Sequence, residues 1–214
     1  MPKGARGAKA GGGRAKATPN RDYIAEYQKR GTILVEADKL DTRAVNEVLG
    51  GMDRVLTDMG VSTSVVSVIA GRNSAKGSAA VNGFGQLTFN NAEFSSYDKA
   101  VAAAKGAPGH FTAPTLAGTG AHEAGHLLEN AIIAKEMATA TNLERSTARI
   151  KSVVPKSVMK EAIKIYGSNP KLSGYGSTNV SEKMAEAVAD HYINGANAHP
   201  FSTVVVGVIK KRLQ

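Results

Sequence analysis

The 214-residue chain contains no cysteine, no tryptophan and only 5% aromatic residues. The absence of cysteine excludes disulfides, thiolate metal sites, iron–sulfur clusters and cysteine nucleophiles. A hydrophobic fraction of 42% is ordinary for a globular protein, so we expect a core of alanine, valine, leucine and isoleucine. Any bound metal would have to be held by histidine and carboxylate side chains.

Long apolar stretches are also absent. No run approaches the roughly 18 residues that a membrane span needs, and the basic N-terminus is not followed by the apolar segment of a secretory signal. We therefore expect a cytoplasmic protein, or one inside a virion assembled there, with no membrane partner.

The net charge of +9 is concentrated at the two ends of the chain. Residues 1–20 carry five basic side chains and no acid, and residues 210–212 add three more, so the rest of the chain is close to neutral. The glycine, alanine, lysine and arginine of residues 1–20 predict a disordered arm, and residues 21–214 then form a single domain. Either end could contact nucleic acid or an acidic protein surface.

Hydrophobic periodicity predicts an α+β fold, with a small mixed or antiparallel sheet in the first half and a mostly helical second half. The expected helices span residues 21–29, 42–59, 97–105, 115–139, 156–166, 180–194 and 201–213. The expected strands span residues 32–36, 61–70, 78–81 and 86–90.

The sequence HEAGH at residues 122–126 is an HExxH motif inside the expected helix 115–139. On a helix, positions i and i+4 place His122 and His126 on one face, where both imidazoles can hold one Zn²⁺. Glu123 would lie beside the metal and could take a proton from a zinc-activated water. Gly125 would let another backbone pass close to this face.

Two histidines leave the coordination of a metal incomplete. The metzincin continuation would need glycine at position 129 and histidine at 132, where the chain has Glu129 and Ile132, so that class is excluded. Glu129 faces the same side as the ligands but lies two turns from His122, which suits an outer contact or solvent exposure. The candidates for the third ligand are Glu129, Glu144, Glu182, Glu186, Asp190 and His191.

Two regions compete to supply this third ligand. Glu144 follows His126 at a spacing near that of thermolysin-like enzymes. On the expected helix 180–194, Glu182 and Glu186 border a broad apolar face, and His191 points the other way. Two acids one turn apart repel each other, and burying them without a cation is costly. A metal with its histidine ligands would relieve both costs, so this helix is favoured over Glu144; solvent-exposed acids are the alternative interpretation.

Residues 175–187 read YGSTNVSEKMAEA. This segment resembles the second zinc-binding segment of the anthrax-lethal-factor-like metallopeptidases, a gluzincin family in which Y-G-x-T-N-x-x-E-x-x-A-E-A follows HExxH. The resemblance implies a zincin-like fold, zinc endopeptidase activity and Glu182 as the third ligand. It also implies that Tyr175 stabilises the oxyanion and that Glu186 hydrogen-bonds a ligand histidine.

The resemblance covers about a third of the chain. Lys183 and Met184 stand where the family often has aromatic residues, and nothing matches the targeting and substrate-recognition domains of the toxin, so its substrates do not transfer. Small stand-alone proteins of this kind look similar to metallopeptidases encoded among bacteriophage structural genes, which would make phage structural proteins possible partners.

The sequence thus predicts a zinc-dependent endopeptidase acting on a protein or peptide that adds as a strand to an exposed edge at Gln86–Asn90. The alternative is a non-catalytic structural or assembly protein, associated with a virion, that keeps the fold and docks through its basic ends. A DNA-binding module acting through those ends alone is a weaker third hypothesis. His110 and His199 have no partner at a ligand spacing and are interpreted as incidental.

Overall fold

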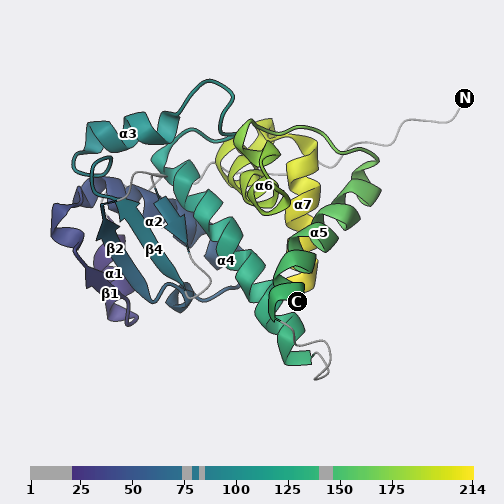
Figure 1. The fold of residues 1–214 in the computed structure, drawn as a ribbon, viewed down its shortest axis with the longest axis horizontal. Helices are drawn as coiled ribbons and strands as arrows, with labels where there is room; N and C mark the ends of the chain where they lie inside the picture. The colour runs from purple at the N-terminus through teal and green to yellow at the C-terminus, as the bar shows by residue number, and fades with distance from the viewer. Residues whose placement is uncertain (1–20, 74–78, 82–84, 140–146) are drawn as a thin grey trace, which may run out of the picture.

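The computed structural model describes residues 21–73, 79–81, 85–139 and 147–214, which form the predicted α+β fold (Figure 1). The predicted arm of residues 1–20 lies outside the described residues. The helices of the described part are α1 (Tyr23–Lys29), α2 (Thr42–Asp58), α3 (Tyr97–Lys105), α4 (Leu116–Thr139), α5 (Thr147–Tyr166), α6 (Val180–Asn194) and α7 (Pro200–Leu213). The strands are β1 (Ile33–Val35), β2 (Val68–Arg72), β3 (Ala79–Val81) and β4 (Gln86–Asn90).

The four strands form one mixed sheet in the order β1-β2-β4-β3. The first three are parallel, with Ile69 opposite Leu87, whereas β3 runs antiparallel to β4 with Ala80 opposite Thr88. The expectation of an exposed edge at Gln86–Asn90 is therefore wrong: β4 is paired on both sides. Among the described strands, β1 and β3 are the edges of the sheet.

The predicted strand at Val61–Ala70 begins later than expected. Ser62 caps a 3₁₀ turn at Thr63–Val65 by accepting a hydrogen bond from the backbone N–H of Ser64. This local hydroxyl contact competes with extended backbone, so β2 starts only at Val68. The β-branched residues therefore predict the strand correctly from Val68 onwards, but not over the preceding residues, which include the 3₁₀ turn.

Helix α5 starts nine residues before the predicted boundary at Lys156 and contains Pro155. A proline lacks the N–H needed inside a helix and normally favours a boundary. Here Val154, Val158 and Ala162 lie one turn apart and are fully buried. Packing of this apolar stripe therefore sustains the helix through the proline.

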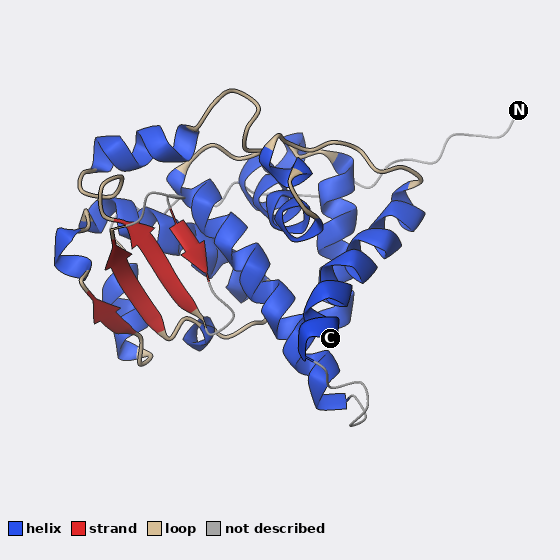
Figure 2. Cartoon of the chain, viewed as in Figure 1, coloured by secondary structure: helices blue, strands red, loops and turns tan. Residues whose placement is uncertain are grey.

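Helix α4 lies at the centre of the molecule, between the sheet and the helices α5, α6 and α7 (Figure 1). Figure 2 shows the division into a sheet-containing part and a helical part on either side of it. Ala121, Ala124, Leu128 and Ile132 of α4 are buried in a core that also includes Leu87 of the sheet. The segment that carries HExxH is thus held by both halves of the fold.

Helices α2 and α4 approach so closely that glycine is needed at their crossing. A Cβ atom built on Gly51 would lie 2.1 Å from the carbonyl oxygen of Ala117, and one on Gly120 would lie 1.8 Å from that of Val48. Glycine inside a helix ordinarily lowers its stability. At Gly51 this is offset by close packing against α4.

Two Gly→Ala exchanges should have opposite effects on the free energy of unfolding, one at this crossing and one on the surface of α7. Gly51→Ala should destabilise the protein by about 1–3 kcal/mol through overpacking against backbone. Gly207 is exposed within α7, and a methyl group added there would meet no neighbouring group within 4 Å. Gly207→Ala should therefore stabilise by about 0.5–1 kcal/mol. Urea unfolding of both variants measures these changes. A stabilising effect of Gly51→Ala would contradict the close approach of α2 and α4 at this residue.

The basic residues at the C-terminal end are already engaged with acidic groups. Lys211 and Arg212 both pair with Glu161, at 3.2 and 3.0 Å, and Lys210 lies 3.4 Å from Asp58. Their charge is therefore partly compensated within the fold; contact of these residues with nucleic acid or an acidic surface stays a prediction. Among the described residues, no helix combines the length and apolar character needed to cross a bilayer.

Candidate metal centre

Helix α4 presents the three polar residues of the HExxH motif from one stretch of backbone. Thr115 precedes the helix, and its hydroxyl accepts a hydrogen bond from the N–H of Gly118, as expected of an N-terminal cap. The rings of His122 and His126 have their centroids 5.0 Å apart. His122 is only 8% exposed and Glu123 only 5%. The one-turn spacing therefore places two imidazoles side by side at the edge of the core, as predicted.

Helix α6 brings Glu182 to the same place. Asn179 caps its N-terminus, and the Asn179 side chain accepts a hydrogen bond of 2.9 Å from the backbone N–H of Glu182. Helix α6 then packs against α4 at Gly125, where an added Cβ would lie 2.7 Å from Cα of Ala185. This confirms that Gly125 admits a second backbone, and the close approach delivers the glutamate to the histidine face.

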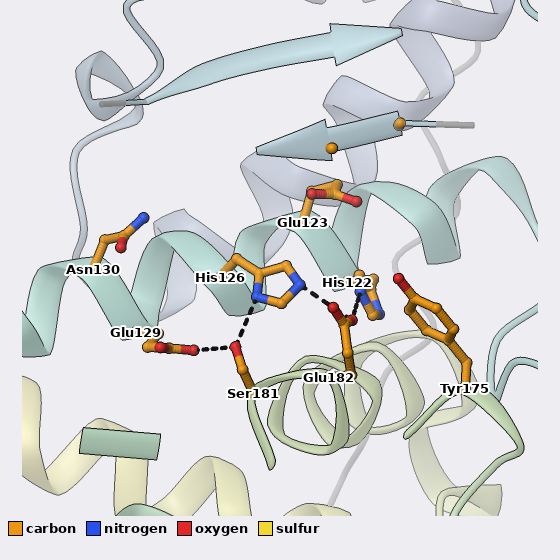
Figure 3. Close-up of a pocket in the computed structure, with 10 residues that line it drawn as sticks. His122, Glu123, His126, Glu129, Asn130, Tyr175, Ser181 and Glu182 are labelled. Atoms are coloured by element: carbon orange, nitrogen blue, oxygen red, sulfur yellow. Dashed lines mark hydrogen bonds and ion pairs between the residues drawn. The ribbon is translucent and has the colours of Figure 1, made fainter. Parts of the chain in front are cut away.

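The three side chains converge on a common point (Figure 3). Oε2 of Glu182 lies 3.0 Å from Nε2 of His122 and 3.4 Å from Nε2 of His126. One donor atom from each residue falls within 4.8 Å of the other two. In a tetrahedral zinc site with Zn–N near 2.0–2.1 Å, neighbouring donors lie roughly 3.3–3.5 Å apart. The donor set and its spacing therefore fit a divalent ion with small adjustments.

Electrostatics also favour a cation here. Burial alone would lower the pKa of His122, but hydrogen bonds to Glu182 and Glu186 overcome it and raise that pKa to about 10. Burial likewise opposes ionisation of Glu182, yet its bonds to His122 and His126 lower its pKa to about 2. The described residues that line the pocket include three glutamates and neither lysine nor arginine. The carboxylates thus strongly stabilise positive charge at this point.

Glu186 orients His122 from the opposite side. Its Oε1 lies 3.0 Å from Nδ1 of His122, and its Oε2 accepts a hydrogen bond of 2.7 Å from the N–H of Thr112. Glu186 is 1% exposed. Since a carboxylate accepts only, Nδ1 of His122 carries a proton for Glu186. In the absence of a metal Nε2 also donates, to Glu182, and a bound ion would take the place of that Nε2 proton. The contact of Glu186 with a ligand histidine, implied by the resemblance, is present.

Tyr175 forms one wall of the site. Its ring centroid lies 5.6 Å from that of His122, and its hydroxyl is directed into the pocket (Figure 3). Burial and the nearby carboxylates of Glu182 and Glu123 raise its pKa to about 12. The hydroxyl therefore stays protonated at neutral pH and can donate a hydrogen bond.

The loop before α4 supports this tyrosine. The N–H of Tyr175 donates to the carbonyl of His110 at 2.9 Å, and the ring of His110 lies 5.4 Å from the tyrosine ring. The interpretation of His110 as incidental is therefore incomplete, because it packs beside a site residue. His199 has a structural role: its side chain caps α7 by accepting from the N–H of Phe201.

The other described candidates for the third ligand have different partners. Asp190 accepts hydrogen bonds from Ser202 and from the backbone N–H of His199, so it joins α6 to α7. His191 contacts Thr203 on the outer side of α6. Glu144 lies outside the described residues. Glu129 is buried and bonds to Ser181 and not to the donor cluster.

Strand β3 borders the site from above. Ala79 and Ala80 line the same pocket as His122, Glu123 and His126, and the pocket has a volume of about 230 Å³. Their small side chains leave space between the sheet edge and α4. A chain could therefore lie between β3 and the three donors.

Two residues that support the site were not predicted from the sequence. Thr112 supports Glu186 through its backbone N–H and its hydroxyl, and Ser181 contacts His126. The position of Ser181 directly before Glu182 was the one available signal for it.

Comparisons with protein families, with curated proteins and with solved structures find no match to this chain. Its functional interpretation therefore depends on the geometry and chemistry of the site.

Proposed function

We propose that the protein is a zinc-dependent endopeptidase with a zincin-like catalytic domain, similar to the anthrax-lethal-factor-like gluzincins. The observation that carries the proposal is the convergence of His122, His126 and Glu182, with Glu123 and Tyr175 at the same pocket. Imidazole and carboxylate donors at this spacing suit zinc better than magnesium or calcium, which prefer oxygen ligands.

His122, His126 and Glu182 would hold the ion, and Nδ1 of His122 is fixed by Glu186. When bound, zinc would supply a Lewis acid that lowers the pKa of water towards neutrality and polarises a peptide carbonyl. Glu123 is buried beside the donors without belonging to the cluster. Its carboxylate would accept the proton of the attacking water and later deliver it to the leaving amine.

Tyr175 would act on the carbonyl oxygen of the scissile peptide. Its raised pKa keeps the hydroxyl protonated, and a donor aimed at a developing oxyanion stabilises the transition state more than the ground state. The backbone hydrogen bond from the N–H of Tyr175 to the carbonyl of His110 holds this donor in place.

The substrate would bind as an extended strand along the outer edge of β3. Among the described strands, β3 pairs only with β4, so its other edge can offer backbone groups to a peptide. Backbone pairing makes recognition tolerant of sequence, and the alanines at 79 and 80 impose little steric selection. This edge replaces Gln86–Asn90 as the expected docking strand.

Cleavage mapping with and without metal tests the function. We expect the zinc-loaded protein to generate new N-termini in a mixture of denatured proteins, chelator treatment to abolish them, and added zinc to restore them. Magnesium should not restore cleavage, because the donor set includes two imidazoles. The proposal fails if zinc-loaded protein yields no new N-termini, or if chelation leaves the same set unchanged.

A further inference from the structure

Nδ1 of His126, on the ring side away from the donor cluster, meets a second pair of residues. It lies 3.3 Å from the hydroxyl oxygen of Ser181, and that hydroxyl donates to Oε2 of Glu129 at 2.5 Å. Figure 3 shows the three side chains in a row, from His126 on α4 through Ser181 to Glu129. We propose that Ser181 and Glu129 form a positioning relay that fixes the ring of His126 for metal binding.

The direction of the hydrogen bonds follows from the chemistry of the groups. The carboxylate of Glu129 can only accept, so the hydroxyl proton of Ser181 points to it. The remaining lone pairs of that oxygen can accept the Nδ1 proton of His126. The imidazole thereby keeps a proton on Nδ1, so that Nε2, 3.4 Å from Glu182, is the nitrogen that would bind a metal.

The two ligand histidines are supported in different ways. His122 meets a carboxylate directly, because Glu186 lies one turn beyond Glu182 on α6. At His126, α6 offers only the short side chain of Ser181 at its first turn, and the carboxylate comes from α4 itself, three residues after the histidine. Ser181 of α6 therefore links His126 to Glu129, two side chains of α4, by contacting both of them.

The burial of Glu129 makes this arrangement costly unless it is satisfied. The residue is 9% exposed, and a buried carboxylate needs hydrogen-bond donors. Loss of the Ser181 hydroxyl would remove a partner from Glu129 and from His126 at once. The relay depends on the metal site of the proposed function, but not on peptide cleavage.

Zinc affinity of the full-length protein, measured by competition with a chromophoric chelator, tests the relay. Ser181→Ala should weaken zinc binding by about 10–100-fold, the usual effect of losing such an outer partner. Ser181→Thr keeps a hydroxyl and should restore most of the affinity. Ser177→Ala is the matched control, because the Ser177 hydroxyl donates to the carbonyl of Ser173. It should bind zinc as the wild type does.

A spectroscopic measurement covers the case in which Ser181→Ala does not fold. Zinc on Nε2 leaves the ring proton of His126 on Nδ1, so the relay is tested by the exchange of that proton: in ¹H–¹⁵N spectra of the zinc-loaded wild type it should be protected from solvent, because the Ser181 hydroxyl accepts it. The relay is wrong if the Nδ1 proton of His126 exchanges freely with solvent, if Ser181→Ala binds zinc as tightly as the wild type, or if Ser181→Thr is as weak as alanine. A wild type that binds no zinc overturns the relay and the metal site together. Zinc binding without peptide cleavage overturns only the endopeptidase.

Discussion

Replacing Glu123 with glutamine should reduce kcat/KM for peptide cleavage by about 10²–10⁴-fold, the usual contribution of a general base, without loss of zinc affinity. The expectation follows from its position: Glu123 lines the pocket and is 5% exposed, but its carboxylate is not one of the three converging donors. Glutamine keeps the shape of the side chain and removes its ability to take a proton. Initial rates on a peptide found by cleavage mapping, with chelator competition for zinc, provide the measurement.

Glu136→Gln is the matched control for this variant. Glu136 lies on the same helix and pairs with Arg212 at 3.4 Å, away from the pocket. Its exchange should leave both the rate and the zinc affinity unchanged. If Glu123→Gln cleaved as fast as the wild type, the general-base role would be excluded and the non-catalytic assembly hypothesis would gain support.

Glu182→Gln should weaken zinc binding by more than about 100-fold, beyond the loss expected for an outer hydrogen-bond partner. The variant removes the only carboxylate in the donor cluster of the described residues and leaves two neutral imidazoles. The cap of α6 uses the backbone N–H of residue 182 and is retained, so the fold should persist. Chelator competition gives the affinity, and unfolding of the metal-free protein checks the fold.

Glu144→Gln separates the two candidates that the sequence left in competition. Glu144 lies outside the described residues, and the cluster of His122, His126 and Glu182 has no need of it as a third protein ligand. Its exchange should leave zinc affinity unchanged. A large loss for Glu144→Gln, together with a small one for Glu182→Gln, would assign the third ligand to the thermolysin-like position instead.

The local parts of the site could be predicted because they depend on helical spacing. The one-turn separation of His122 and His126 places them on one face whatever surrounds the helix, and the small residue at Gly125 indicated the close crossing that α6 makes there. The face of α6 bordered by two acids pointed to Glu182. These features depend on periodicity within one helix and on the residue types.

The parts that could not be predicted depend on how distant elements are placed. The order of strands along the chain does not give their order in the sheet, so the position of Gln86–Asn90 between β2 and β3 was not predicted. The role of Ser181 depends on the register between α4 and α6, and that of Thr112 on the path of a loop. Neither register nor path leaves a periodic signal in the sequence.

Anomalous diffraction at the zinc edge, from crystals of the zinc-loaded protein, tests most directly whether two helices share one ion. We predict a single peak bound by Nε2 of His122, Nε2 of His126 and a carboxylate oxygen of Glu182, at zinc–ligand distances of about 2.0–2.2 Å. A peak that excludes Glu182, or zinc held only at other residues, would contradict the account.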